Sequence, residues 1–483
     1  MKSNNVKLFC RNLWENVIAL KSFYVLYILF LILTAYSAVS SISNYKAQNS
    51  LKEAHQIKAR TSWEANPDKH PHRMAHFGTF AFRISPPLTI FDNGIENYTG
   101  NTVFLEAHRQ NSVNFSEATF STGALRFGEL SLAFLLQIIL PLILFFIGFS
   151  TVAQDRENGT LKVLLAQGAQ WKEILFGKTL GLFLVAQLFF FPVLLVVFLG
   201  LFVFSAVEMD ASLLIRIGLL SLSYLSFFFV VSALTIAVSA RSKQAKNALL
   251  KLLVFWLFFV VFLPKSAQAL GSYYFPTPTK LAFNTVIEQE EIEKGDSHNP
   301  NDPYYNQLRD SVLALHNVSK TTDLPFNYSG FIMREGEKIS SQLYRKHFKD
   351  LVSIYQHQNG VTRYSSLINP FTAIKQLSMC VAGTDFTAYL NFQDQADAYR
   401  YSLAQTMNEL QMEFISPKRE SGSEGKKHVI EHEHWEEFAD FVHQPIPLFR
   451  SLASATFALF SLLFWVFVAL GILNTTAKTA TAL

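Results

Sequence analysis

Six long apolar runs divide the chain, and the polar stretches between them differ greatly in length. A helix needs about 20 residues to cross the hydrocarbon core of a bilayer. Each run reaches or approaches that length, so we predict six transmembrane helices. They are residues 23–39, 130–152, 180–207, 213–238, 249–270 and 452–473. Lys251 and Lys265 interrupt the fifth run, but each long side chain can reach its own interface.

The Lys and Arg residues of the short connections all fall on one side of these six spans. They precede the first span, separate the second from the third and the fourth from the fifth, and follow the sixth. Such residues collect on the cytoplasmic side of a membrane. The opposite side carries an acidic turn at residues 207–210. We therefore predict cytoplasmic N- and C-termini, and a first span that is retained rather than cleaved as a signal peptide.

Two long polar blocks then fall outside the cytoplasm and are predicted to form folded modules. The first is predicted to be mixed α/β, because it contains short β-favouring runs such as residues 102–105. The second is predicted to be mainly helical, with helices at 330–358, ending at Asn359-Gly360, and at 385–414. The predicted organisation is 1–42, the N-terminal segment and first span; 43–127, the first module; 128–270, spans two to five; 271–446, the second module; and 447–483, the sixth span and tail.

Composition agrees with an α-helical polytopic membrane protein. Half of the 483 residues are hydrophobic and only 16% are charged, whereas about a quarter of a soluble domain is charged. No nucleic-acid partner is predicted. Cys10 and Cys380 are predicted on opposite sides of the bilayer, so they cannot form a disulfide bond with each other.

The connection between the second and third spans carries the strongest functional signal. Residues 151–181 read TVAQDRENGTLKVLLAQGAQWKEILFGKTLG. Gly159 can permit a sharp turn after the span, and Thr160 can cap the next helix. The apolar face of that helix consists of Leu161, Val163, Leu164 and Leu165. A soluble partner could grip such a helix as a rigid lever, although periodicity alone also fits an ordinary amphipathic loop. Three charged residues are expected to stay in water: Lys162, Lys172 and Glu173.

This segment closely resembles the signature of ABC-2 type permeases. In that family an acidic-basic-acidic turn and Gly-Thr-Leu precede a coupling helix and a Gly-Lys at the next span. The matching residues, within a coupling segment at 154–178, are Asp155, Arg156, Glu157, Gly159, Thr160, Leu161 and Gly177-Lys178. Asp155 stands where Glu is more usual. Residues 66–79 and 105–111, and then 369–374 and 382–385, look like the two large periplasmic insertions of the copper-enzyme-maturation-like permeases.

The resemblance implies the permease subunit of an ATP-binding-cassette transporter in a bacterial inner (cytoplasmic) membrane, and we expect an exporter. Two copies of a separate ATPase would bind ATP and Mg²⁺, and a second permease chain, identical or a sister, would complete the pathway. This chain would be no enzyme and bind no cofactor directly. Gly177-Lys178-Thr179 lacks the earlier Gly of a phosphate loop, because Lys172 stands there. The alternative is a membrane-anchored maturation, scaffold or mechanotransmission factor that acts on periplasmic partners without transport of its own.

All 13 His residues lie in the two predicted modules, and two groups have ligand-like spacing. In the second group, His428 and His432 would share one face of a helix. Histidine is also a common hydrogen-bonding residue, and the first group can satisfy loop backbone groups. We therefore predict no metal site, and a metal-binding periplasmic sensor is a third functional class. The groups are His70, His72 and His76, which are the candidate ligands if a site exists, and His428, His432 and His434.

Overall fold

The computed structural model describes residues 3–111, 130–203, 209–295, 299, 301–417 and 428–481. Within this part of the chain, six helical segments are long and apolar enough to cross a membrane, and they overlap the six predicted spans. The prediction of an α-helical multi-pass membrane protein is confirmed. The spans are α2 (Lys21–Glu64), Leu132–Glu157, α10 (Trp171–Val203), α11 (Ala211–Arg241), Ala245–Tyr274 and α19 (Leu448–Thr479). Of the acidic turn at 207–210, residues 207 and 208 lie outside the described residues.

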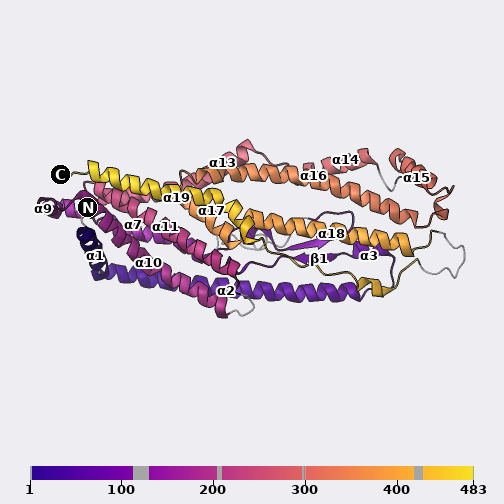
Figure 1. The fold of residues 1–483 in the computed structure, drawn as a ribbon, viewed down its shortest axis with the longest axis horizontal. Coiled ribbons are helices and arrows are strands. Elements are labelled where there is room, and N and C mark those ends of the chain that lie inside the picture. Colours follow the sequence, from indigo (N-terminus) through magenta and orange to yellow (C-terminus); the bar gives the residue numbers. More distant parts are fainter. Residues whose placement is uncertain are drawn as a thin grey trace.

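The molecule is elongated, with the membrane helices gathered in one half (Figure 1). Both chain ends lie at the end of the membrane half that is farthest from the other half, as an even number of spans requires. The other half, called the distal region below, contains α3 (Pro71–Phe77), α14 (Lys280–Lys294), α15 (Pro303–Leu315), most of α16 (Tyr328–Ser365) and α18 (Phe386–Phe414). Strands β1 (Thr79–Phe82) and β2 (Thr102–Leu105) pair antiparallel there, from Thr79 opposite Leu105 to Phe82 opposite Thr102. The strand predicted at 102–105 is thus present.

Helix α2 runs without a break from the membrane half into the distal region (Figure 1). Its 44 residues extend about 66 Å at a rise of 1.5 Å per residue, while the hydrocarbon core is about 30 Å thick. About half of the helix therefore projects beyond the bilayer. The boundary predicted at residues 42 and 43 falls inside this one rigid element. The boundary predicted at 127 and 128 lies outside the described residues.

Two spans contain a π-helical turn just before a proline. In the second span, α6 (Leu132–Phe134) and the π-turn η3 (Leu135–Ile139) precede α7 (Leu140–Gly148), which contains Pro141. In the fifth span, α12 (Ala245–Trp256) and the π-turn η4 (Leu257–Phe262) precede α13 (Leu263–Tyr274), which contains Pro264. A proline removes a backbone donor and its ring crowds the preceding turn. The wider π-turn accommodates both effects without ending the span.

The predicted end of a helix at Asn359-Gly360 is wrong, because α16 continues to Ser365. Glycine inside a helix costs about 1 kcal/mol relative to alanine. Close packing against α13 opposes that cost: a Cβ built on Gly271 would lie 2.9 Å from the backbone oxygen of Gln358. The Gln358 amide also donates to the Phe275 carbonyl at 2.6 Å. Tertiary contacts thus override the local turn signal.

A helix from the second predicted module packs into the membrane bundle. Helix α17 (Pro370–Ala382) contacts both α11 and α19. Its residues Phe371, Ile374 and Val381 belong to the same apolar core as the spans. The distal region has a separate core around Trp63, Met407 and other buried residues. The range 271–446 is therefore structurally divided between the two halves of the molecule.

Candidate functional site

The turn after the second span has the geometry expected of a break between two helices. Helix α8 (Ala153–Glu157) has Asn158 as its C-cap residue, and α9 (Thr160–Ala166) begins two residues after that cap. Gly159 has a φ of 75°, the left-handed conformation that glycine adopts without a Cβ penalty. Gly159 is also the N-cap residue, and Thr160 is the first residue of the helix. The prediction that Thr160 caps α9 is therefore wrong.

Each of the three charged residues of this turn holds a different membrane span. The Asp155 carboxylate pairs with the Lys178 ammonium on α10. The Arg156 guanidinium donates to two carbonyls at the end of α11, Ala240 at 2.7 Å and Ser242 at 2.6 Å. The Glu157 carboxylate accepts the backbone N–H of Ala245, at the start of α12, at 3.0 Å. One turn on the second span therefore fastens the third, fourth and fifth spans at the same end.

The Gly177-Lys178-Thr179 sequence lies inside helix α10 and not in a phosphate-binding loop. Lys178 is 4% exposed and also donates to the backbone oxygen of Thr151. Glu173, which was predicted to lie in water, is 1% exposed. Its carboxylate accepts the Asn5 amide at 2.8 Å and the backbone N–H of Gln170 at 3.2 Å. The first turns of α10 thus carry two buried charged residues, each with partners.

The N-terminal helix α1 (Ser3–Ala19) packs directly on two glycines of α10. A Cβ on Gly177 would lie 2.6 Å from the Phe9 Cβ, and one on Gly181 would lie 2.9 Å from the Cys10 carbonyl oxygen. Glycines four residues apart allow two helices to approach this closely within a membrane. The glycine of the signature's Gly-Lys pair therefore makes room for α1, while the lysine binds the turn.

Helix α9 projects from the end of the membrane half (Figure 1). Leu161 is fully buried and fixes the helix to the bundle, whereas Val163 is 56% exposed. The predicted apolar face is therefore divided between the bundle and solvent. Further exposed residues accompany Val163 on this helix and just after it: Thr160, Lys162, Ala166 and Gln167. The result is a small, rigidly anchored surface available to a partner.

Sequence reasoning missed Ser239, which completes the turn. Its hydroxyl donates to the Phe149 carbonyl at 2.7 Å and accepts the backbone N–H groups of Val152 and Ala153, both at 3.1 Å. These backbone groups are left without helical partners where the span breaks. Helix α11 contains several other serines, so the sequence does not single out Ser239 for this role.

A buried chain of hydrogen bonds joins the loop before β2 to the second span. Asp92 accepts the Ser378 hydroxyl, which lies 3.1 Å from the Tyr224 hydroxyl. Tyr224 in turn accepts the Gln137 amide at 2.7 Å, and Gln137 belongs to the π-turn η3. Burial raises the pKa of Asp92, and hydrogen bonds from Ser378 and Gly94 oppose the shift. The loop at Asp92 is thereby connected to the second span a few residues before Pro141.

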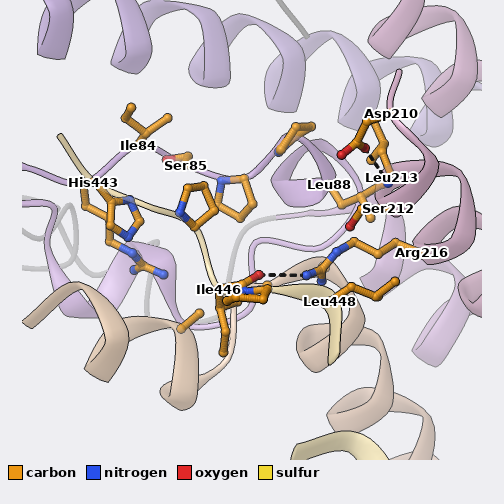
Figure 2. A pocket seen from close by; sticks show the side chains of 18 of the residues that line it. Ile84, Ser85, Leu88, Asp210, Ser212, Leu213, Arg216, His443, Ile446 and Leu448 are labelled. Atoms are coloured by element: carbon orange, nitrogen blue, oxygen red, sulfur yellow. Dashed lines mark hydrogen bonds between the residues drawn. The ribbon is translucent and has the colours of Figure 1, made fainter. Parts of the chain in front are cut away.

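A cavity of about 470 Å³ lies where the membrane helices meet the distal region (Figure 2). Arg216 lines it from α11 and donates to the carbonyls of Val381 at 2.7 Å and Ile446 at 3.0 Å. The chain before α19 supplies His443 on the other side. Arg216 thus ties α11 to the end of α17 and to the segment just before α19.

We expect His443 to make stability depend on pH. Burial lowers its pKa to about 4, and the positive charge of Arg83 acts in the same direction. The unfolded chain therefore binds more protons than the folded chain between pH 6.5 and 4, so stability falls as pH falls through that window. The loss amounts to at most about 3.4 kcal/mol at 1.36 kcal/mol per pKa unit. Thermal unfolding of the wild type and of His443→Leu, followed from pH 7 to 4, measures this loss of stability. If the midpoints of both proteins fall equally with pH, His443 is not the cause.

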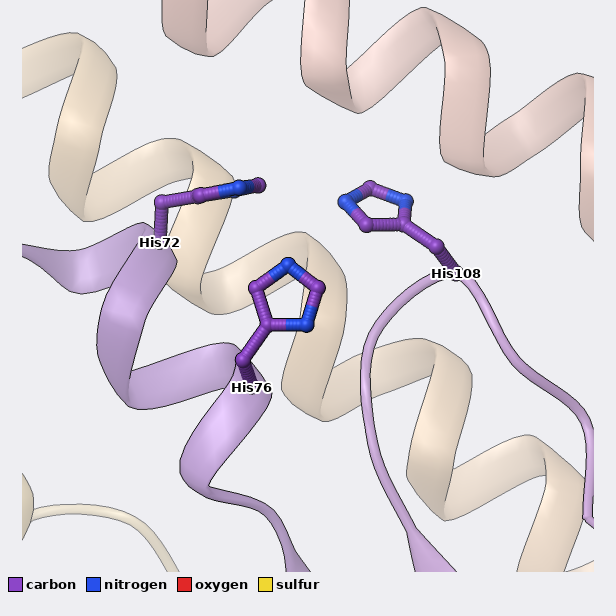
Figure 3. Close-up of side chains that lie close together, drawn as sticks. All are labelled: His72, His76 and His108. Atoms are coloured by element: carbon purple, nitrogen blue, oxygen red, sulfur yellow. The ribbon is translucent and has the colours of Figure 1, made fainter.

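The structure rearranges the predicted histidine groups. His72, His76 and His108 lie together (Figure 3). The His70 Nδ1 instead accepts the backbone N–H of His72 at 3.2 Å and caps α3. His428 precedes an isolated bridge at Ile430, and His432 and His434 lie in a short 3-10 turn (His432–Trp435), so the predicted shared helical face of His428 and His432 is wrong. The sequence prediction omitted His108, although His108 lies within residues 105–111, which carry part of the family resemblance.

Comparison with known proteins adds one match. Residues 281–444 match a family described as a domain of unknown function (DUF3526). The matched range includes α16, α17 and α18, and it does not reach the turn at 155–161. A search of curated proteins finds no match.

Proposed function

We propose that this chain is the membrane-spanning subunit of an ATP-binding-cassette transporter. In this proposal, helix α9 transmits the ATP-driven motion of a separate ATPase to the membrane helices. One observation carries the proposal: the Asp155-Arg156-Glu157 turn fastens three other spans and presents α9 at its tip. A force applied to α9 would act on four spans together, because the turn links them through an ion pair and backbone hydrogen bonds. ATP-driven export requires such a stiff connection between a soluble ATPase and the membrane helices.

The proposed assembly contains two permease chains and two separate ATPase subunits that bind ATP and Mg²⁺. The fifth span supports a second permease chain, because only 11% of its most apolar window is buried within one chain. Its exposed side chains include Leu250, Val254 and Phe262. The proposed location is a bacterial inner membrane, with α9 and both termini in the cytoplasm and the distal region in the periplasm.

A mechanical role in the periplasm is the second candidate, and the continuity of α2 favours it. This helix carries any tilt of the first span directly to the distal region, where Trp63 donates to the Trp435 carbonyl at 2.9 Å. Motion of the bundle would then act on a periplasmic partner without moving a substrate. ATP-dependent uptake or release of substrate in proteoliposomes separates transport from this role.

Val163→Asp is expected to uncouple the partner ATPase. The substitution places a charge on the exposed apolar part of α9, where docking would bury it, and leaves Leu161 in the bundle. Burying an unpaired charge is costly, so we expect at least a tenfold loss of ATPase co-purification and of its stimulation. Co-purification of the full complex followed by ATP hydrolysis assays in lipid measures both quantities.

Leu315→Asp is the matched control, because Leu315 is also an exposed apolar side chain but lies in the distal region. It should leave the interaction with the ATPase unchanged. If Val163→Asp retains normal ATPase binding and stimulation, α9 is not the coupling element and the proposed function loses its support.

A further inference from the structure

Three imidazole rings of the first polar block converge where that block contacts Glu337 of the second. His72 and His76 lie four residues apart on α3, so they share a face of that helix. His108 faces them from the turn after β2 (Figure 3). One ring nitrogen from each of the three residues lies within 4.8 Å of the others. The ring centroids are 4.7 to 5.5 Å apart.

His108 is held in an unusual backbone conformation that aims its side chain at the other two rings. Its φ is 59°, in the left-handed region that side-chain-bearing residues rarely adopt. One oxygen of the Glu337 carboxylate fixes this conformation, because it accepts the His108 backbone N–H at 3.0 Å and lies 3.1 Å from Nδ1. A carboxylate accepts hydrogen bonds, so the proton of the neutral ring lies on Nδ1. The lone pair of Nε2 is then available.

That nitrogen has no partner of its own. His108 Nε2 is buried and makes no hydrogen bond within the part of the chain that the structure describes. Its orienting carboxylate is itself fixed, since the Arg400 guanidinium donates to the other Glu337 oxygen at 2.6 Å. Glu337 is fully buried and Arg400 is 2% exposed. A carboxylate that orients a histidine from behind is the usual outer layer of a protein metal site.

We propose that His72, His76 and His108 bind one Zn²⁺ ion in the distal region. Three neutral imidazoles are a common ligand set for this ion and leave a fourth position for water or a partner's side chain. Zinc–nitrogen bonds of about 2.0–2.1 Å place tetrahedral ligands closer together than the present spacing. Rotation of the exposed His76 ring and adjustment of His72 would close the site around the ion. Bound zinc would join α3 to the β2 turn, and through Glu337 to α16.

The experiment uses the full chain in detergent, purified with a tag that contains no histidine. After removal of metal by chelator, Zn²⁺ is titrated in competition with a chromophoric chelator, and bound metal is counted by elemental analysis. The wild type is expected to hold one Zn²⁺ per chain. His76→Ala and His108→Ala should each weaken binding at least 100-fold. Glu337→Gln should weaken it about 10–100-fold, the usual effect of an outer-layer partner.

His316→Ala is the matched control, because His316 is an exposed histidine of the distal region that lies outside the cluster. It should bind zinc as the wild type does. Thermal unfolding supplies a second readout: Zn²⁺ should raise the midpoint of the wild type and of His316→Ala, but not of His76→Ala. His76 is exposed, so its substitution should leave the metal-free chain folded, as the metal-free midpoint will report. A wild type that binds no zinc, or a His76→Ala variant that binds it normally, would overturn the proposal.

Discussion

Replacing Asp155 by Asn is expected to destabilise the chain by up to about 3–5 kcal/mol, the cost of leaving a buried charge without its partner. Lys178 is 4% exposed and its ammonium pairs with Asp155. The carboxamide keeps the shape of the side chain but not its charge. The Thr151 carbonyl, the other acceptor of the Lys178 ammonium, cannot neutralise it. The midpoint of thermal unfolding in lipid-containing detergent reports the loss.

A double variant tests whether the charge is the cause. Adding Lys178→Met to Asp155→Asn removes the unpaired ammonium, and an apolar residue in place of a buried charge is often neutral or stabilising. We therefore expect the double variant to recover much of the lost stability. Lys172→Met is the control on the same helix, because Lys172 is exposed and should change stability by less than about 0.5 kcal/mol. Equal losses in the single and double variants would contradict a role for the ion pair.

Replacing Gly177 by Leu is expected to release helix α1 from the bundle. The new Cβ would lie 2.6 Å from the Phe9 Cβ and 2.7 Å from the Val6 carbonyl oxygen, so the two backbones must separate. Inserting bulk into a packed contact costs about 1–3 kcal/mol, occasionally more. The side chains of Phe9 and Leu13, which are buried against the bundle, would lose that burial as well. Protease cleavage within α1 should become much faster in membranes.

Gly218→Leu is the matched control for this prediction. Gly218 lies on span helix α11, and a Cβ built on it meets no atom of the described residues within 4 Å. The control should insert normally and keep α1 protected from protease. If Gly177→Leu keeps α1 equally protected, the close approach of the two helices is not required for docking.

The membrane character of this protein could be predicted from its sequence, because hydropathy is a local property. A run of about 20 apolar residues is stable only across a bilayer or in a large core, and all six runs lie in helices that are long and apolar enough to cross a membrane. The sharp turn at Gly159 was equally predictable, since the conformational freedom of glycine belongs to the residue itself. The helix that begins after Asp385 also follows from its local N-cap chemistry.

Local signals failed where tertiary contacts were stronger. Asn359-Gly360 reads as a turn, yet packing of α16 on α13 keeps the helix intact. Glu173 reads as a solvated residue on an amphipathic helix, yet docking of α1 buries it beside Asn5. In both cases a neighbour distant in sequence decided the outcome.

The partners of the functional residues depended on the tertiary structure alone. The sequence singled out the acidic-basic-acidic turn, but the fold determined that Asp155 binds Lys178 and that Glu157 binds the start of α12. It singled out closely spaced histidines, but the fold assigned His70 to a helix cap and brought His108 from 32 residues further on to face His76. Propensity and hydropathy act over a few neighbouring residues. Ion pairs and ligand sets form wherever the packed backbone brings side chains together.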